Sequence, residues 1–197
     1  PISGRPIAGV IGWQGAAWLE RPERIAEEEP DRAIAALNIA PGATVADVGA
    51  GSGYFTVRLA AAVGPSGRVY ATDIQPEMLA MLRERLAREQ VGNVTPVQGT
   101  TTDPRLPEAS VDLVLMVDVY HEFSQPQVML RALRQAIKPG GRLVLLEYRK
   151  EDPSIPIRLE HKMTVDEARQ ELEAEGFVFE RVDGRLPRQH ILIFTRP

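Results

Sequence analysis

The strongest constraint on the fold of this chain is a regular alternation of strand-like and helix-like segments from residue 30 onward. Short apolar runs are separated by segments in which apolar residues recur every three or four positions, as on one face of a helix. This alternation predicts an α/β fold, a doubly wound, mostly parallel sheet with helices on both faces. We expect seven strands, at about 44–48, 68–73, 93–99, 111–118, 142–149, 177–182 and 190–195.

The two ends of the chain depart from this alternation. The loop "DGRLPRQ" between the last two strands is too short for a crossover helix, so these strands are expected to form an antiparallel hairpin. Residues 1–29 contain glycines, prolines, both tryptophans and no clear strand. We therefore predict an N-terminal arm, 1–29, before a single domain, 30–197. The acidic run Glu27 to Glu29 is interpreted as a solvated helical face.

Composition narrows the range of partners. The 23 basic and 27 acidic residues give a net charge of −4, so no basic excess indicates nucleic acid or an anionic membrane surface. The apolar runs are too short for a membrane helix, which needs about 20 residues. No cysteine is present, which excludes disulfides and thiolate metal sites. We predict a cytoplasmic monomer or homodimer. Because the chain begins with Pro1, removal of an export signal remains an open alternative.

The glycine-rich stretch "VADVGAGSGYF", Val45 to Phe55, lies between the first strand and the following helix. In sheets of this kind, ligands bind beyond the carboxyl ends of the strands. A dinucleotide site favours G-x-G-x-x-G, with the pyrophosphate at the helix N-terminus. Here the spacing is G-x-G-x-G, and Asp47 would place negative charge near a phosphate. A cationic ligand fits this stretch better.

The stretch resembles the glycine motif of class I S-adenosylmethionine-dependent methyltransferases, and the similarity extends over about 30–197. "VYATDIQPEML" resembles the family's ribose-binding strand end, "ASVDLVLMVDVYHEF" its fourth strand, and "LRQAIKPGGRLVLLEY" its fifth. The resemblance implies a Rossmann-like fold and S-adenosyl-L-methionine as cofactor. Thr100 stands where many relatives have the aspartate that binds adenine. The implied cofactor residues are Asp47, Gly49, Ala50, Gly51, Gly53, Asp73, Ile74, Met78, Thr100, Thr101 and Asp118.

Three ionisable residues are the candidates for catalysis at the acceptor side. His121 follows the fourth strand and has a side chain that titrates near neutrality, as a general base requires. Glu122 would orient it or bind the acceptor, and His161 follows the fifth strand. The alternative for each is an ordinary loop residue. We predict no metal site, although these imidazoles and carboxylates would also suit a divalent metal.

The sequence thus predicts methyl transfer to a small-molecule acceptor, at an oxygen, nitrogen or carbon atom. The tetrapeptide after the fourth strand is "VDVY", not the "NPPY" type of adenine-N6 enzymes, and no basic domain is appended. Trp13, Gln14 and Trp18 in the arm are expected either to close over the cofactor or to pack on the sheet or a second copy. Two alternatives remain: a non-catalytic S-adenosylmethionine-binding protein and a nicotinamide-dependent oxidoreductase.

Overall fold

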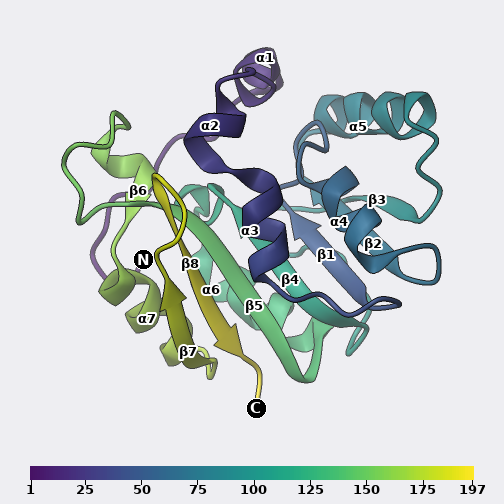
Figure 1. The fold of residues 1–197 in the computed structure, drawn as a ribbon. Helices are drawn as coiled ribbons and strands as arrows, with labels where there is room; N and C mark the ends of the chain where they lie inside the picture. Colours follow the sequence, from purple (N-terminus) through teal and green to yellow (C-terminus); the bar gives the residue numbers. More distant parts are fainter.

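A single eight-stranded sheet forms the centre of the computed structural model, which describes all residues 1–197 (Figure 1). The strand order is β3-β2-β1-β4-β5-β8-β7, and the short β6 pairs with β5. The strands are β1 (Thr44–Val48), β2 (Arg68–Asp73), β3 (Val94–Gln98), β4 (Val111–Val117), β5 (Ile137–Arg149), β6 (Lys162–Met163), β7 (Val178–Asp183) and β8 (Gln189–Thr195). The order reverses between β1 and β4, which creates a switch point where such sheets bind ligands.

The pairing confirms the predicted fold class. β1 to β5 are parallel, while β8 is antiparallel to both β5 and β7. Two details were not predicted: β6 makes an eighth strand, and β5 begins at Ile137, ahead of the expected residue 142. A register shift between Val111 and Leu113 accommodates this early start. Gly141 is required there, because a Cβ atom would lie 2.6 Å from Cγ2 of Ile137.

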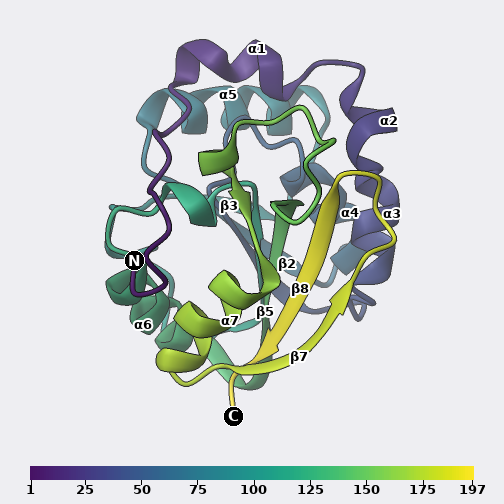
Figure 2. The ribbon, with the colours of Figure 1, turned by 90° about the vertical axis from the view of Figure 1, so that its left-hand side faces the viewer.

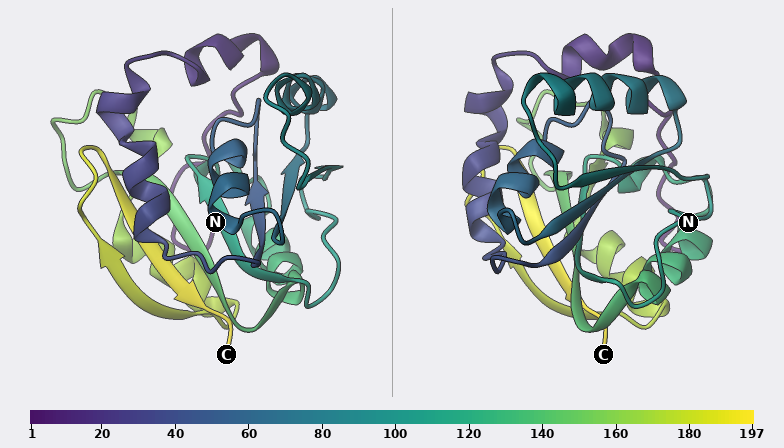
Figure 3. Two further views of the ribbon diagram at one scale, coloured as in Figure 1. Left: turned by 45° about the vertical axis from the view of Figure 1, so that its right-hand side comes forward. Right: turned by 90° about the vertical axis from the view of Figure 1, so that its right-hand side faces the viewer.

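Helices cover both faces of the sheet, as the views in Figures 2 and 3 show. Alternate strand residues point to opposite faces. Val45 and Leu113 pack in one apolar cluster with α3 (Pro30–Ala36) and α4 (Thr56–Val63), and α5 (Pro76–Arg88) packs beside them. Ala46 and Val114 belong to the opposite cluster with α6 (Pro126–Ala136) and α7 (Val165–Ala174). No helix is both long and apolar enough to cross a membrane.

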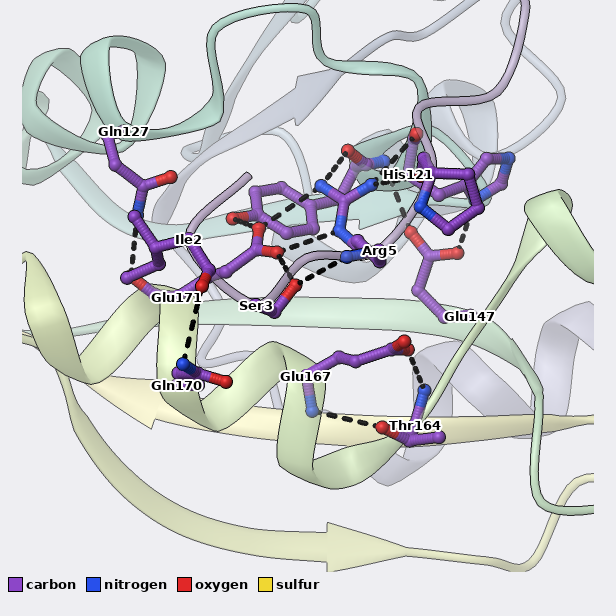
Figure 4. A network of polar contacts seen from close by, with 12 residues as sticks. Ile2, Ser3, Arg5, His121, Gln127, Glu147, Thr164, Glu167, Gln170 and Glu171 are labelled. Atoms are coloured by element: carbon purple, nitrogen blue, oxygen red, sulfur yellow. Dashed lines mark hydrogen bonds and ion pairs between the residues drawn. The ribbon is translucent and has the colours of Figure 1, made fainter.

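The N-terminal arm runs over the carboxyl ends of the strands, seen at the top of Figure 1. It contains the 3₁₀ turn η1 (Trp13–Gly15) and the short helices α1 (Ala16–Leu19) and α2 (Arg24–Glu28). Its start is anchored by Arg5, whose Nε donates to Oε1 of Glu171 on α7 at 2.9 Å (Figure 4). Farther along, Glu20 accepts hydrogen bonds from Ser52 in the glycine stretch and Arg85 on α5. Side chains from the glycine stretch, α5 and α7 therefore hold the arm.

Candidate functional site

A cavity of about 310 Å³ lies at the carboxyl ends of β1, β2 and β4, beneath the arm. This is the switch point of the sheet, where the sequence predicts a ligand. Eight of the eleven predicted cofactor residues line it: Gly49, Gly51, Asp73, Ile74, Met78, Thr100, Thr101 and Asp118. Asp47, Ala50 and Gly53 do not. The wall is largely apolar with a few carboxylates, as expected of a small-molecule site.

The glycine loop lies close against the end of β2. The amides of Gly49 and Ala50 both donate to the carbonyl oxygen of Thr72, at 2.8 and 3.0 Å. Gly49 and Gly51 have φ angles of +76° and +56°, a region that residues with a Cβ atom rarely adopt. A Cβ at Gly49 would also lie 2.5 Å from Cγ2 of Val119. Ala50 therefore holds the loop through its backbone and does not reach the cavity wall.

Gly53 allows the loop to pack on a helix. A Cβ atom there would lie 2.4 Å from Cδ1 of Leu82 on α5, and the φ angle is +92°. The third glycine of the motif therefore serves the close approach of the loop to α5. The structure does not place it on the cavity wall.

Asp73 ends β2 with its carboxylate facing both the loop and the cavity. Oδ2 accepts a hydrogen bond from the amide of Gly51 and Oδ1 one from the amide of Gln75, each at 2.9 Å. Burial raises the pKa of Asp73, and these backbone amides oppose that rise. The carboxylate is thus fixed at the strand end, with its residue on the cavity wall.

Asp47 lies one layer deeper than predicted. Its side chain is buried and accepts a hydrogen bond from Oγ1 of Thr56 at 2.6 Å. Burial raises the pKa of Asp47 to about 6, although the Thr56 hydroxyl works in the opposite direction. Asp47 therefore connects β1 to the first turn of α4, and its contact with a ligand stays a prediction.

Asp118 provides an unpartnered acceptor at the cavity wall. Its Oδ2 accepts from Nε2 of Gln189 at 2.6 Å, while the buried Oδ1 has no hydrogen-bond partner. Burial raises the pKa of Asp118 well above its usual range, and the nearby carboxylates of Glu28 and Glu147 add to that rise. A cationic donor in the cavity would satisfy Oδ1 and reduce the repulsion among these carboxylates.

Sequence reasoning missed the arm residues Arg24 and Glu28, which both line the cavity. Glu28 was predicted to be solvated, but it is only 1% exposed. Its carboxylate accepts from Nε of Arg24 at 2.7 Å and from the hydroxyl of Tyr148 at 2.8 Å. Because Tyr148 lies 120 positions away in the sequence, no local pattern could have revealed this pair.

The two tryptophans of the arm have different surroundings. Trp18 lines the cavity, and the guanidinium of Arg21 stacks over its ring at 3.8 Å. Trp13 is 40% exposed and does not line the cavity, and Gln14 is exposed. The backbone around Trp13 is held by Gln75, which accepts from the amide of Trp13 at 2.8 Å and donates to the carbonyl oxygen of Ile11 at 3.0 Å.

The three predicted catalytic residues come together at one end of the cavity. Nδ1 of His121 lies 2.6 Å from Oε2 of Glu147, and its Nε2 lies 3.1 Å from Nδ1 of His161. Figure 4 shows the first of these contacts. Glu122 lies on the cavity wall and accepts from the amide of Ile11 at 3.3 Å. The two histidines are not on the wall but behind it.

This cluster perturbs the protonation of its members. Burial lowers the pKa of His121, but the Glu147 carboxylate raises it by more, so the pKa lies above the usual value. Burial raises the pKa of Glu122 to about 7, against the effect of His121. Burial and the charge of His121 lower the pKa of His161. Groups that titrate near neutrality at a cavity wall are typical of acid–base sites.

Comparison with known proteins gives one matching family. A methyltransferase domain model matches residues 45–141. The ubiquinone/menaquinone biosynthesis C-methyltransferase of Ectopseudomonas mendocina is 35% identical over 113 residues, which cover 57% of this chain and 44% of that protein. The corresponding enzyme of Burkholderia multivorans is 36% identical over 118 residues, 59% of this chain and 48% of that protein. The chain spans less than half the length of these curated relatives.

A solved structure is similar over almost the whole chain. A methyltransferase from Aquifex aeolicus, described as S-adenosylmethionine-dependent, superposes with a TM-score of 0.90 and is 26% identical. The match covers 95% of this chain and 100% of that one. At this coverage the match extends into both the arm and the C-terminal hairpin, which lie outside the family model.

Proposed function

Because the chain belongs to the class I S-adenosylmethionine-dependent methyltransferases, we propose that it transfers a methyl group from S-adenosylmethionine to a small molecule. The observation that carries the proposal is the unpartnered Oδ1 of Asp118 in a cavity that also holds the strand-end carboxylate of Asp73. The cofactor has a cationic amino-acid end and a ribose diol, and each finds a complementary carboxylate there.

The carboxylates of Asp73 and Asp118 would fix the orientation of the cofactor along the cavity wall. Asp73 would accept hydrogen bonds from the ribose hydroxyls, and Ile74 and Met78 would pack on adenine, with Thr100 and Thr101 near its edge. Asp118 would accept from the amino group. The carboxylate of the amino-acid tail would approach Arg24, which also lines the cavity. This orientation leaves the methyl group for the part of the cavity near Glu122.

The chemical step is an in-line displacement at the methyl carbon. A lone pair on the acceptor forms the new bond as the carbon–sulfur bond breaks, and its electron pair stays on sulfur. Alignment and exclusion of water supply much of the rate enhancement of such a step. The arm would provide the exclusion of water, since Ile11 and Trp18 form part of the cavity wall.

The residues proposed to bind the cofactor do not determine which atom of the acceptor receives the methyl group. The curated relatives are named C-methyltransferases, and we propose a carbon, oxygen or other nucleophilic atom of a small molecule as acceptor. The family model ends at residue 141, before Glu147 and His161. The side-chain cluster behind the wall that would face the acceptor therefore lies partly outside the matched region.

Calorimetric titration of the wild-type chain and Asp73→Asn with S-adenosylmethionine tests the proposal, with NAD as a competing candidate. Asp73→Asn should weaken binding by about ten- to a hundredfold, since a charge-assisted hydrogen bond contributes about 1.5–3 kcal/mol. Asp112→Asn is the matched control: Asp112 also accepts from a backbone amide, that of Thr44 at 2.8 Å, but at the opposite end of the sheet.

Unchanged affinity in Asp73→Asn would remove the ribose assignment. Binding of NAD but not of S-adenosylmethionine would favour an oxidoreductase. Binding without release of S-adenosylhomocysteine across a panel of phenols, quinols, thiols and amines would favour a non-catalytic binding protein.

A further inference from the structure

We propose that His121, Glu122 and His161 bind one divalent cation of the zinc class next to the cavity, where Glu122 lines the wall and the two histidines lie behind it. The sequence predicted catalytic roles for these residues and no metal, so the inference departs from that expectation. One ligand atom from each of the three residues lies within 4.8 Å of the others. Two imidazoles and one carboxylate, with a further position open, form a common donor set of catalytic zinc sites.

The distance between the two imidazole nitrogens suits a hydrogen bond and also suits a shared cation. Nε2 of His121 and Nδ1 of His161 lie 3.1 Å apart, with the ring planes at 88°. Two nitrogens at zinc-bond lengths of about 2.0–2.1 Å, in tetrahedral or octahedral arrangement, lie about 2.9–3.4 Å from each other. Rotation of the Glu122 side chain would bring its carboxylate into the same set.

Glu147 supplies the outer support that metal-binding histidines usually have. Its Oε2 lies 2.6 Å from Nδ1 of His121, and its Oε1 accepts from the amide of Tyr120 at 3.1 Å. Such a carboxylate holds the proton on Nδ1 and leaves the lone pair of Nε2 for a metal. Glu147 is fully buried, so its contact with His121 is shielded from solvent.

The arm holds the backbone of the proposed ligands. The amide of Ala8 and Nη1 of Arg5 both donate to the carbonyl oxygen of His121, each at 3.1 Å. The amide of Ile11 donates to Oε1 of Glu122 at 3.3 Å. Two hydrogen bonds therefore hold the backbone of His121, whereas the Glu122 side chain is held by the single contact from Ile11. A fixed backbone is what a preorganised ligand set requires.

The role of the cation rests on the proposed function, although its binding does not. Glu122 belongs to both the cluster and the cavity wall, so a bound cation would be next to the acceptor. An acceptor hydroxyl or thiol bound to it would release its proton to water. The oxygen or sulfur lone pair would then bond to the methyl carbon as the carbon–sulfur bond of S-adenosylmethionine breaks, and the electron pair of that bond stays on the cofactor's sulfur. This assigns an alcohol, phenol or thiol as the acceptor class.

The test measures metal directly, with no cofactor or acceptor present. The chain is stripped with a chelator, dialysed against Zn²⁺, and analysed for bound metal; Co²⁺ is then titrated and followed by its visible absorption. We expect one Zn²⁺ per chain and Co²⁺ bands of a site with nitrogen and oxygen ligands. His161→Ala, which removes a half-buried ligand, should abolish both signals.

Two further variants keep the outcome interpretable. Glu147→Gln should lower Zn²⁺ affinity by about ten- to a hundredfold, the usual effect of losing an outer-sphere carboxylate. His190→Gln removes the third histidine, which lies outside the cluster, and should bind Zn²⁺ like the wild type. Folding of each variant is checked by circular dichroism.

Absence of stoichiometric Zn²⁺ and Co²⁺ in the folded wild type would overturn the inference and leave a histidine hydrogen-bonded relay. Equal metal binding by His161→Ala would also overturn it. Metal binding without S-adenosylmethionine binding would uphold the site and reject the proposed function. S-adenosylmethionine binding without metal binding would reject the metal site and leave the proposed function standing.

Discussion

At Gly49 a side chain would be both strained and overpacked. The φ angle of Gly49 is +76°, and a Cβ atom would lie 2.5 Å from Cγ2 of Val119. A left-handed conformation costs an alanine about 1–2 kcal/mol, and overpacking costs about 1–3 kcal/mol more. Gly49→Ala should therefore lower the free energy of unfolding by about 2–5 kcal/mol in urea denaturation.

Gly140→Ala separates the two causes. Gly140 has a φ angle of +78° but no atom within 4 Å of an added Cβ, so only the conformational cost should appear. Equal destabilisation by the two substitutions would mean that the contact with Val119 contributes nothing.

Asp47 makes the stability of the protein depend on pH. Its folded-state pKa is about 6, against an ordinary value of 3.8, mainly because the carboxyl is buried. The folded chain therefore retains this proton more strongly than the unfolded chain. The stabilisation is complete below pH 3.8 and is lost as the pH rises through 6, amounting to about 3 kcal/mol for this shift.

Asp47→Asn should remove this dependence. Urea denaturation at pH 4.5 and pH 7.5 should show that the wild type loses more stability than the variant over this interval. Changes of equal size in the two proteins would contradict the raised pKa.

At the level of elements, the contacts of Glu20 help to hold the arm on the domain but contribute little to overall stability. Glu20 bridges Ser52 and Arg85, and it is partly exposed to solvent. Exposed ion pairs contribute at most about 1 kcal/mol. Glu20→Gln should therefore barely change the unfolding free energy, yet it should increase hydrogen exchange in the arm around Trp18.

Glu89→Gln is the control for this experiment. Glu89 also pairs with Arg85, at 3.5 Å, but it directly follows α5 and its other ion-pair partner, Arg88, is on the same helix. Faster exchange in both variants would show that Arg85 acts on α5 and not through the arm.

The elements themselves were largely predictable, whereas their irregularities were not. The periodicity of "PEMLAMLRERLAR" and the apolar run "VDLVLMV" identified α5 and β4, because both patterns are local. The early start of β5 depends on a register shift against Val111, which is a property of two strands together. The hydrogen bond between Glu28 and Tyr148 likewise exists only in the folded chain.

The site shows the same division between local and long-range information. The motif and the strand ends placed eight cofactor residues on the cavity wall, since the carboxyl ends of parallel strands share one edge. Asp47 lies behind the cavity wall, which the sequence could not show because it does not reveal the direction of a side chain; its contact with a ligand stays a prediction. Its partner Thr56 became evident only in the structure.

At the level of the whole molecule, ligand binding should stabilise the entire fold. The cavity wall combines residues from Val10 in the arm to Met129 on α6, so a ligand there connects segments across the domain. S-adenosylmethionine at about 100 times its dissociation constant should add about 2.7 kcal/mol to the unfolding free energy. For a chain of this size, this corresponds to a rise in Tm of about 5–10 °C.

Thermal unfolding monitored by tryptophan fluorescence measures this shift. Asp73→Asn at the same ligand concentration should show a smaller rise, and NAD should cause none. An equal rise with NAD would contradict the proposed selectivity.

The docking of Arg5 on Glu171 also sets an order of events during synthesis. The two residues are separated by 166 positions, so the arm emerges from the ribosome long before its anchor exists. The sheet from β3 to β5 can form while Arg5 is still undocked. Only when α7 has been made can Arg5 dock on Glu171. The start of the arm is thus among the last segments to reach its place, although the arm farther along can already contact Ser52 and Arg85.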